Sequence, residues 1–188
     1  MRKLVFTLLM FLTLSLNAQN DIVKFLGIPI DGNKSEMISK LEKKGFVLVN
    51  GYDDMLEGSF NGSNVYVSIV TYNNKVYRIF VQDTIGYNEA EIKIRFNNLV
   101  YQFQTNNKYW HKPDVNQFLG EDFSISYEMD VLHKQIQAAY IQKTEVKDDE
   151  VIRVSNIVWF TIQKNDINNY SIGLYYDNLN NAPNGEDL

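Results

Sequence analysis

Residues 33–60 read NKSEMISKLEKKGFVLVNGYDDMLEGSF, and they place an amphipathic helix directly before the first strands of a sheet. Asn33 and Glu36 have the spacing of a helix cap, in which the asparagine accepts from the third helical amide and the glutamate reaches back. Apolar residues recur behind this start at helical spacing, and Gly45 suits the left-handed position past a helix end. We predict a helix over residues 34–44, followed by strands over 46–49 and 55–60.

The strands continue as an antiparallel meander. Asn61-Gly62 is a hairpin signal, and Asn73-Asn74 turns the chain again. Residues 65–72 form the strand between these two turns. Their alternation places Val65, Val67 and Ile69 on one face, and Tyr66, Ser68 and Val70 on the other. Residues 75–81 then return along them, so this first unit is predicted to be a helix followed by a meander.

The same order recurs in the second half of the chain. Asn88-Glu89-Ala90-Glu91 repeats the Asn-x-x-Glu start, and apolar residues at helical spacing predict a helix over 89–105. Further strands are predicted over residues 123–130, 136–141, 151–163 and 170–176, with a solvated turn at 147–150. The Asn-rich tail is expected to start at Asp177 and to be frayed.

The predicted fold class is therefore α+β, with two helix-plus-antiparallel-meander units. Ser63-Asn64-Val65 and Ser155-Asn156-Ile157 fall at equivalent places in the two units, which suggests a tandem duplication. The alternative is that capped helices and meanders recur by chance. The units are predicted to span residues 19–86 and 87–188 within one compact domain.

The first eighteen residues have the pattern of a secretory signal peptide. Arg2 and Lys3 precede an uncharged apolar run over residues 4–16, and Ala18 is the expected last residue removed. The run is shorter than the ~20 residues of a spanning helix, so we expect an exported chain, periplasmic or secreted, that does not span a membrane. Its removal takes the formal charge from −5 to −7, because two cations and no acid are lost. An acidic chain does not favour nucleic acid as a partner.

Residue types limit the chemistry that the chain can perform. With no Cys, disulfides and zinc–thiolate sites are excluded, and two distant histidines give no zinc spacing. Asp31, Asn33, Ser35 and Glu42 match positions of a calcium loop, but Glu36 stands where that loop needs glycine, and the helix is the favoured reading. No metal and no cofactor are therefore expected.

Acidic residues in polar stretches offer one catalytic alternative. A glycoside hydrolase needs two carboxyl groups at a fixed gap with their pKa values pushed apart. The candidates are Asp53, Asp54, Glu57, Glu121 and Asp122. No neighbouring apolar pattern predicts the pocket that would raise one of these pKa values, so a small hydrolase is the least favoured function.

The most unusual segment follows the second helix. It brings together Tyr109, Trp110 and His111, whose rings could form a surface for sugars or a peptide. The alternative is that both large aromatics pack back on the sheet and lock the helix exit. These three residues are the predicted ligand-binding site.

Several segments look familiar when taken together. They are residues 25–38 with Leu41 and residues 44–46, then residues 74–78, 92–97 and 184–188, and they resemble uncharacterised exported proteins of gut-commensal Gram-negative bacteria. The resemblance covers most of the chain and implies no activity. The order of elements is similar to the β-lactamase-inhibitor-protein-like fold, whose members are small periplasmic or secreted interaction modules.

Together, these patterns predict an exported, non-enzymatic binding module for a protein or glycan of the envelope or the extracellular space. The alternatives are a glycan-binding accessory protein that uses Tyr109 and Trp110, and the small hydrolase.

Overall fold

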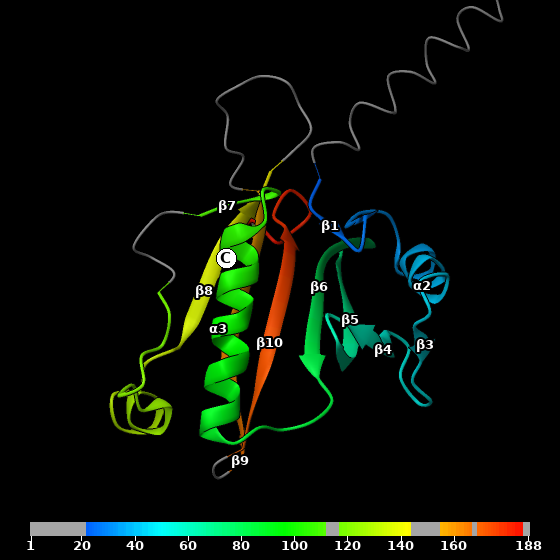
Figure 1. The fold of residues 1–188 in the computed structure, drawn as a ribbon. Helices are drawn as coiled ribbons and strands as arrows, with labels where there is room; N and C mark the ends of the chain where they lie inside the picture. The colour runs from blue at the N-terminus through cyan, green and yellow to red at the C-terminus, as the bar shows by residue number, and fades with distance from the viewer. Residues whose placement is uncertain (1–21, 112–116, 144–154, 167–168, 186–188) are drawn as a thin grey trace, which may run out of the picture.

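The computed structural model describes residues 22–111, 117–143, 155–166 and 169–185, and its centre is one eight-stranded antiparallel sheet (Figure 1). In spatial order the strands are β3 (Val47–Leu48), β4 (Met55–Phe60), β5 (Ser63–Tyr72), β6 (Lys75–Asp83), β10 (Asn169–Asn178), β9 (Asn156–Asp166), β8 (Gln137–Gln142) and β7 (Tyr109–Trp110). The α+β class with an antiparallel sheet is thus confirmed.

The two predicted units form the two halves of this sheet. Each half is a meander, and the last strands of the two meanders, β6 and β10, pair antiparallel at the centre. Ser63-Asn64-Val65 begins β5, and Ser155-Asn156-Ile157 leads into β9, so each lies at the third strand of its half. This symmetric order is what a tandem duplication would produce, and the duplication itself stays a prediction.

One helix belongs to each half, and both begin where the sequence predicts. α2 (Lys34–Glu42) starts after Asn33, whose side chain accepts from the Glu36 amide. α3 (Glu89–Thr105) matches the predicted span, and Asn88 and Glu91 complete a capping box. α2 ends two residues earlier than predicted, and Gly45 takes the left-handed conformation behind it.

The predicted turns also hold. Asn61-Gly62 and Asn73-Asn74 have positive φ at both residues, the geometry of a tight hairpin turn that follows the twist of the strands. The registers agree, because Phe60 pairs with Ser63 and Tyr72 with Lys75.

The core lies on one face of the sheet. α2, α3 and the short hairpin of β1 (Lys24–Phe25) and β2 (Ile28–Pro29) pack there on a row of apolar residues that crosses the strands in register. The row is Leu56, Val67, Val81, Leu174, Phe160 and Ala138. This face carries the apolar core, whereas most side chains of the opposite face, called the open face below, are partly exposed.

The strand predicted over residues 123–130 is wrong. The chain turns into a short π-helix over Tyr127–Val131, in which the Leu132 amide donates to the Tyr127 carbonyl. Two contacts from side chains to backbone amides favour this turn, because Glu89 accepts from the Ile125 amide at 2.6 Å and Ser124 accepts from the Tyr127 amide. The alternation of apolar and polar residues carries no information on these contacts.

The prediction that the tail is frayed from Asp177 onward is also wrong for its first residues. Asp177 and Asn178 complete β10 and are buried. The side chain of Asn178 donates to the Ile30 carbonyl, and that of Asn181 donates to Asp31 and to the Val76 carbonyl. The turn predicted over residues 147–150 lies outside the described residues.

Candidate functional site

Three aromatic rings stand side by side at the centre of the open face. Phe80 on β6, Tyr175 on β10 and Trp159 on β9 are register partners. The centroids of Phe80 and Tyr175 lie 4.7 Å apart, and those of Tyr175 and Trp159 lie 4.0 Å apart with the rings nearly parallel. We call these three residues the aromatic ladder.

Small residues flank the ladder on both sides. The register partner of Phe80 on β5 is Ser68, and that of Trp159 on β8 is Ala139, which is exposed. Both neighbours have short side chains, and the Phe80 and Trp159 rings are partly exposed.

An ion pair holds the end of the ladder in place. Arg78 donates two hydrogen bonds to Asp177, of 2.6 and 2.8 Å, and the Trp159 indole nitrogen donates a third at 2.9 Å. The side chain of Asp177 is 5% exposed and that of Arg78 is 30% exposed. The carboxylate thus lies under the guanidinium and fixes the orientation of both Arg78 and Trp159.

The Arg78 guanidinium also lies near aromatic rings. Its central carbon is 5.1 Å from the Tyr175 centroid and 5.9 Å from that of Trp159, within the range of cation–π attraction. The hydrogen bond to Asp177 raises the pKa of Arg78, and burial raises the pKa of Tyr175. At neutral pH the open face therefore presents a permanent cation beside a neutral phenol.

A glutamine pair extends the fixed region below the ladder. Gln163 donates to the Tyr175 hydroxyl at 3.0 Å, and Gln82 donates to Gln163 at 3.2 Å. The Gln163 side chain lies over Gly173, where an added Cβ would come within 2.8 Å of it. Glycine at this position is what lets the glutamine lie flat across the sheet.

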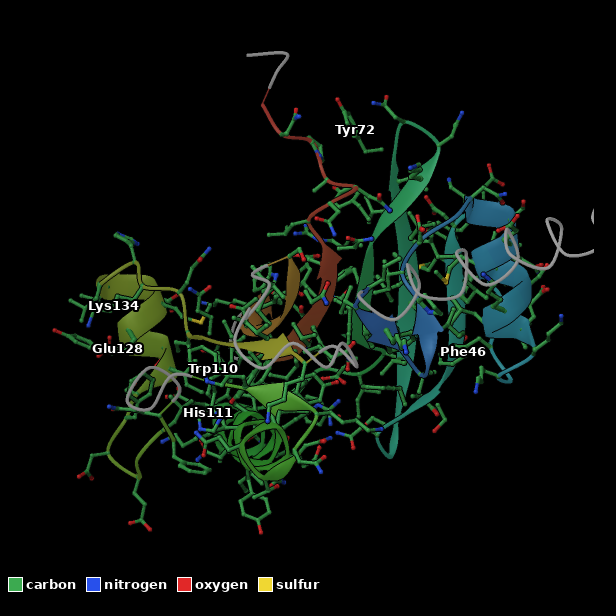
Figure 2. All side chains as sticks on the ribbon, turned by 90° about the horizontal axis from the view of Figure 1, so that it is seen from above. Phe46, Tyr72, Trp110, His111, Glu128 and Lys134 are labelled. Atoms are coloured by element: carbon green, nitrogen blue, oxygen red, sulfur yellow. The ribbon has the colours of Figure 1, made fainter. Side chains whose placement is uncertain are left out.

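The predicted binding residues Tyr109, Trp110 and His111 do not share one face. In β7, Trp110 pairs with Ile141, which continues through Ile157 to Asp177, so Trp110 lies on the open face and is 38% exposed. Tyr109 points to the core side, 4.7 Å from the Phe103 ring, and His111 is partly buried 6.1 Å from Tyr140. Figure 2 shows Trp110 and His111 in the half of the molecule that carries Glu128 and Lys134, with Phe46 in the opposite half.

The candidate carboxylates lie in exposed stretches of both halves. Asp53 is exposed, Asp54 pairs with Lys34 at 3.5 Å, and Glu57 points outward from β4. Glu121 and Asp122 form an exposed turn in the other half. Among the described residues, no three His, Asp or Glu side chains gather as a metal site would need.

Sequence reasoning missed the ladder itself. The alternation within each strand predicts two faces, but the pairing of β6 with β10 joins residues far apart in the chain, and only this pairing aligns Phe80 with Tyr175.

No helix within the described ranges has the length and apolar character needed to cross a bilayer. Comparisons with family models, curated proteins and solved structures gave no significant match.

Proposed function

We propose that this chain is an exported, non-enzymatic interaction module that binds a protein of the envelope or the extracellular space on the open face of its sheet. The observation that carries the proposal is the aromatic ladder beside Arg78. Trp, Tyr and Arg are the side chains that contribute most to protein–protein affinity, and they do so from clusters near the centre of an interface.

Rigidity supports the same proposal. Asp177 fixes Arg78 and Trp159, and Gln163 fixes Tyr175, so little side-chain entropy remains to be lost on association. Export, periplasmic or secreted, is supported by the basic start and apolar run of residues 1–16.

A glycan is the second candidate ligand, and a specific observation favours it. The outer side of Trp159 faces Ala139, which leaves an indole surface on which an apolar sugar face could stack. Trp110 from the predicted site lies on the same open face, so both aromatics could serve one ligand.

A blocking substitution tests the proposal. Ala139→Arg places a long side chain beside Trp159 without touching the core, and Ala90→Arg, at an exposed alanine of α3, is the matched control. We expect a partner cross-linked from envelope extract by the wild-type chain and by Ala90→Arg to be lost with Ala139→Arg. Equal capture by all three chains would exclude the open face as the binding surface. Retention on an immobilised polysaccharide that is lost only with Ala139→Arg would identify a glycan as the ligand.

A further inference from the structure

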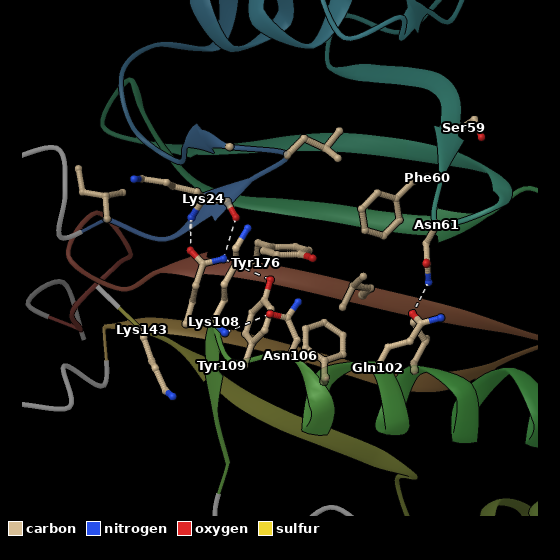
Figure 3. A pocket seen from close by; sticks show the side chains of 17 residues that line it. Lys24, Ser59, Phe60, Asn61, Gln102, Asn106, Lys108, Tyr109, Lys143 and Tyr176 are labelled. Carbon is tan, nitrogen blue, oxygen red and sulfur yellow. Dashed lines mark hydrogen bonds between the residues drawn. The ribbon is translucent and has the colours of Figure 1, made fainter. Parts of the chain in front are cut away.

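A groove of about 800 Å³ lies on the core side of the sheet, opposite the open face. Figure 3 shows it between the β1–β2 hairpin, the turn that joins β4 to β5, and the C-terminal part of α3, with β10 as its floor. The groove thus lies where the two halves of the fold meet. Its volume is in the range of sites that enclose one small molecule.

The middle of the groove is apolar. Leu174 and Tyr176 form the floor, Leu99 and Phe103 come from α3, and Phe60 comes from the end of β4. Leu174, Tyr176, Leu99 and Phe103 belong to the hydrophobic core, so they are held in place by packing below the groove. These four side chains are 3–7% exposed, so each presents a narrow apolar strip to the groove, and the partly buried Phe60 ring adds to it.

The charged residues of the groove are all cations. Lys24, Lys108 and Lys143 line it, and no Asp or Glu is found among the described residues that do so, although the whole chain has a formal charge of −5. Figure 3 shows the three lysines at one end of the groove and Asn61 and Gln102 at the other. Over the part of the groove that the structure describes, the charge is therefore opposite in sign to that of the whole chain.

Hydrogen bonds give the groove a fixed shape. At the lysine end, the side-chain oxygen of Gln142 accepts from the backbone N–H of Lys24 at 2.6 Å. The side-chain nitrogen of Gln142 donates to the backbone carbonyl of Lys24 and to the Tyr109 hydroxyl. At the other end, Asn61 donates to Gln102 at 2.8 Å and joins the β4–β5 turn to α3. Both ends are thus held by contacts between segments far apart in the sequence.

We propose that this groove binds one molecule of a carboxylate that carries a single alkyl chain, with its carboxylate at Lys108 and Lys143 and its apolar tail over Leu99, Phe103 and Leu174. Charge-assisted hydrogen bonds from ammonium groups suit a carboxylate, and the apolar floor suits an alkyl chain. A bilayer surface is a poorer fit, because an acidic protein is repelled by anionic lipid. This site is separate from the open face.

Calorimetric titration of residues 19–188, the chain expected after removal of the predicted signal peptide, with dodecanoate below its critical micelle concentration tests the proposal. We expect saturable 1:1 binding, and no binding of dodecyltrimethylammonium, which has the same tail and the opposite charge. Lys108→Gln and Lys143→Gln should each weaken dodecanoate binding about 3-fold, as exposed charge pairs do, and about 10-fold together. Lys44→Gln, at an exposed lysine behind α2, is the matched control and should leave binding unchanged.

The outcomes separate this site from its alternatives. Equal binding of the cationic amphiphile, an unchanged affinity in the double lysine variant, or binding only to anionic lipid vesicles would each overturn the proposal. NMR shifts of the Asn61 and Gln102 side-chain amides on addition of dodecanoate would place the ligand in the groove, and shifts confined to the Trp159 indole would contradict it. The Ala139→Arg variant should bind dodecanoate as tightly as the wild-type chain. Dodecanoate binding in the groove can therefore be confirmed even if the open face binds no protein.

Discussion

The ion pair beneath the aromatic ladder should contribute strongly to stability, and Arg78→Met measures how much. In the native chain, Asp177 accepts two hydrogen bonds from Arg78 and one from Trp159 while its side chain is only 5% exposed. Removing the guanidinium leaves a buried carboxylate with the indole as its remaining side-chain donor. Such losses cost about 3–5 kcal/mol, and the 30% exposure of Arg78 places the expected value near 3.

Urea unfolding, followed by near-ultraviolet circular dichroism, gives the free energy of unfolding directly. About 3 kcal/mol corresponds to a fall in Tm of about 6–12 °C for a domain of this size. Lys134→Met is the control, because Lys134 pairs with Glu128 at 2.7 Å but is 60% exposed, and it should cost less than about 1 kcal/mol. Combining Arg78→Met with Asp177→Asn should recover at least half of the loss, since the buried charge is removed. A loss below about 1 kcal/mol in Arg78→Met, or additive losses in the double variant, would refute this reasoning.

Three further predictions concern the core and the helices. Asn88→Ala removes the capping box of α3 and should lower the free energy of unfolding by about 1 kcal/mol in urea titrations, whereas an unchanged value would mean that water replaces the cap. Tyr140→Phe should raise the free energy of unfolding by about 1 kcal/mol, because the buried Tyr140 hydroxyl has no hydrogen-bond partner among the described residues. A destabilised variant would mean that the hydroxyl has a partner. Burial raises the pKa of Tyr176 above its ordinary value of 10, so the unfolded chain releases this proton first and stability should fall as pH rises above 10, by up to about 1.4 kcal/mol per pH unit. Tyr176→Phe should make this fall less steep in unfolding measurements between pH 9 and 11, and the remaining slope belongs to other tyrosines such as Tyr175, whose pKa burial also raises. An identical slope would contradict the assignment.

Local signals explain why so much of the fold could be predicted. The cap formed by Asn88 and Glu91 lies within four residues, and the turn at Asn61-Gly62 depends on two. Both are complete in the sequence, and they give the start of α3 and the register of β4 with β5. The alternation of Val65, Val67 and Ile69 then assigns the buried face of β5 correctly, because a strand exposes its faces with a period of two.

The wrong predictions share a different cause, which is a contact between residues far apart in the chain. The segment after Phe123 alternates like a strand, but the Glu89 carboxylate binds the Ile125 amide and turns the chain. The tail is rich in asparagine like many frayed ends, but Asn178 reaches the Ile30 carbonyl across nearly the whole sequence. No window of local sequence contains both partners of these bonds.

The candidate site was only partly predictable for the same reason. Trp110 was singled out from its local composition, and it does lie on the open face. The residues with which it shares this face come from β8, β9, β10 and β6, and their alignment depends on strand pairing. Tyr109, its neighbour, points to the other side, since successive residues of a strand alternate.

The β1–β2 hairpin breaks the symmetry between the two halves. Asn156, at the position that matches Asn64, is buried, and its side chain accepts from the Val23 amide at 3.2 Å, whereas Asn64 is exposed. Gln142 and Asn178, also from the second half, bind the backbone of Lys24 and Ile30. The hairpin that precedes the first helix is thus hydrogen-bonded to the strands of the second unit. If the chain arose by duplication, these amides add to the β6–β10 pairing that joins the two copies, and Gln142 also lines the lysine end of the groove.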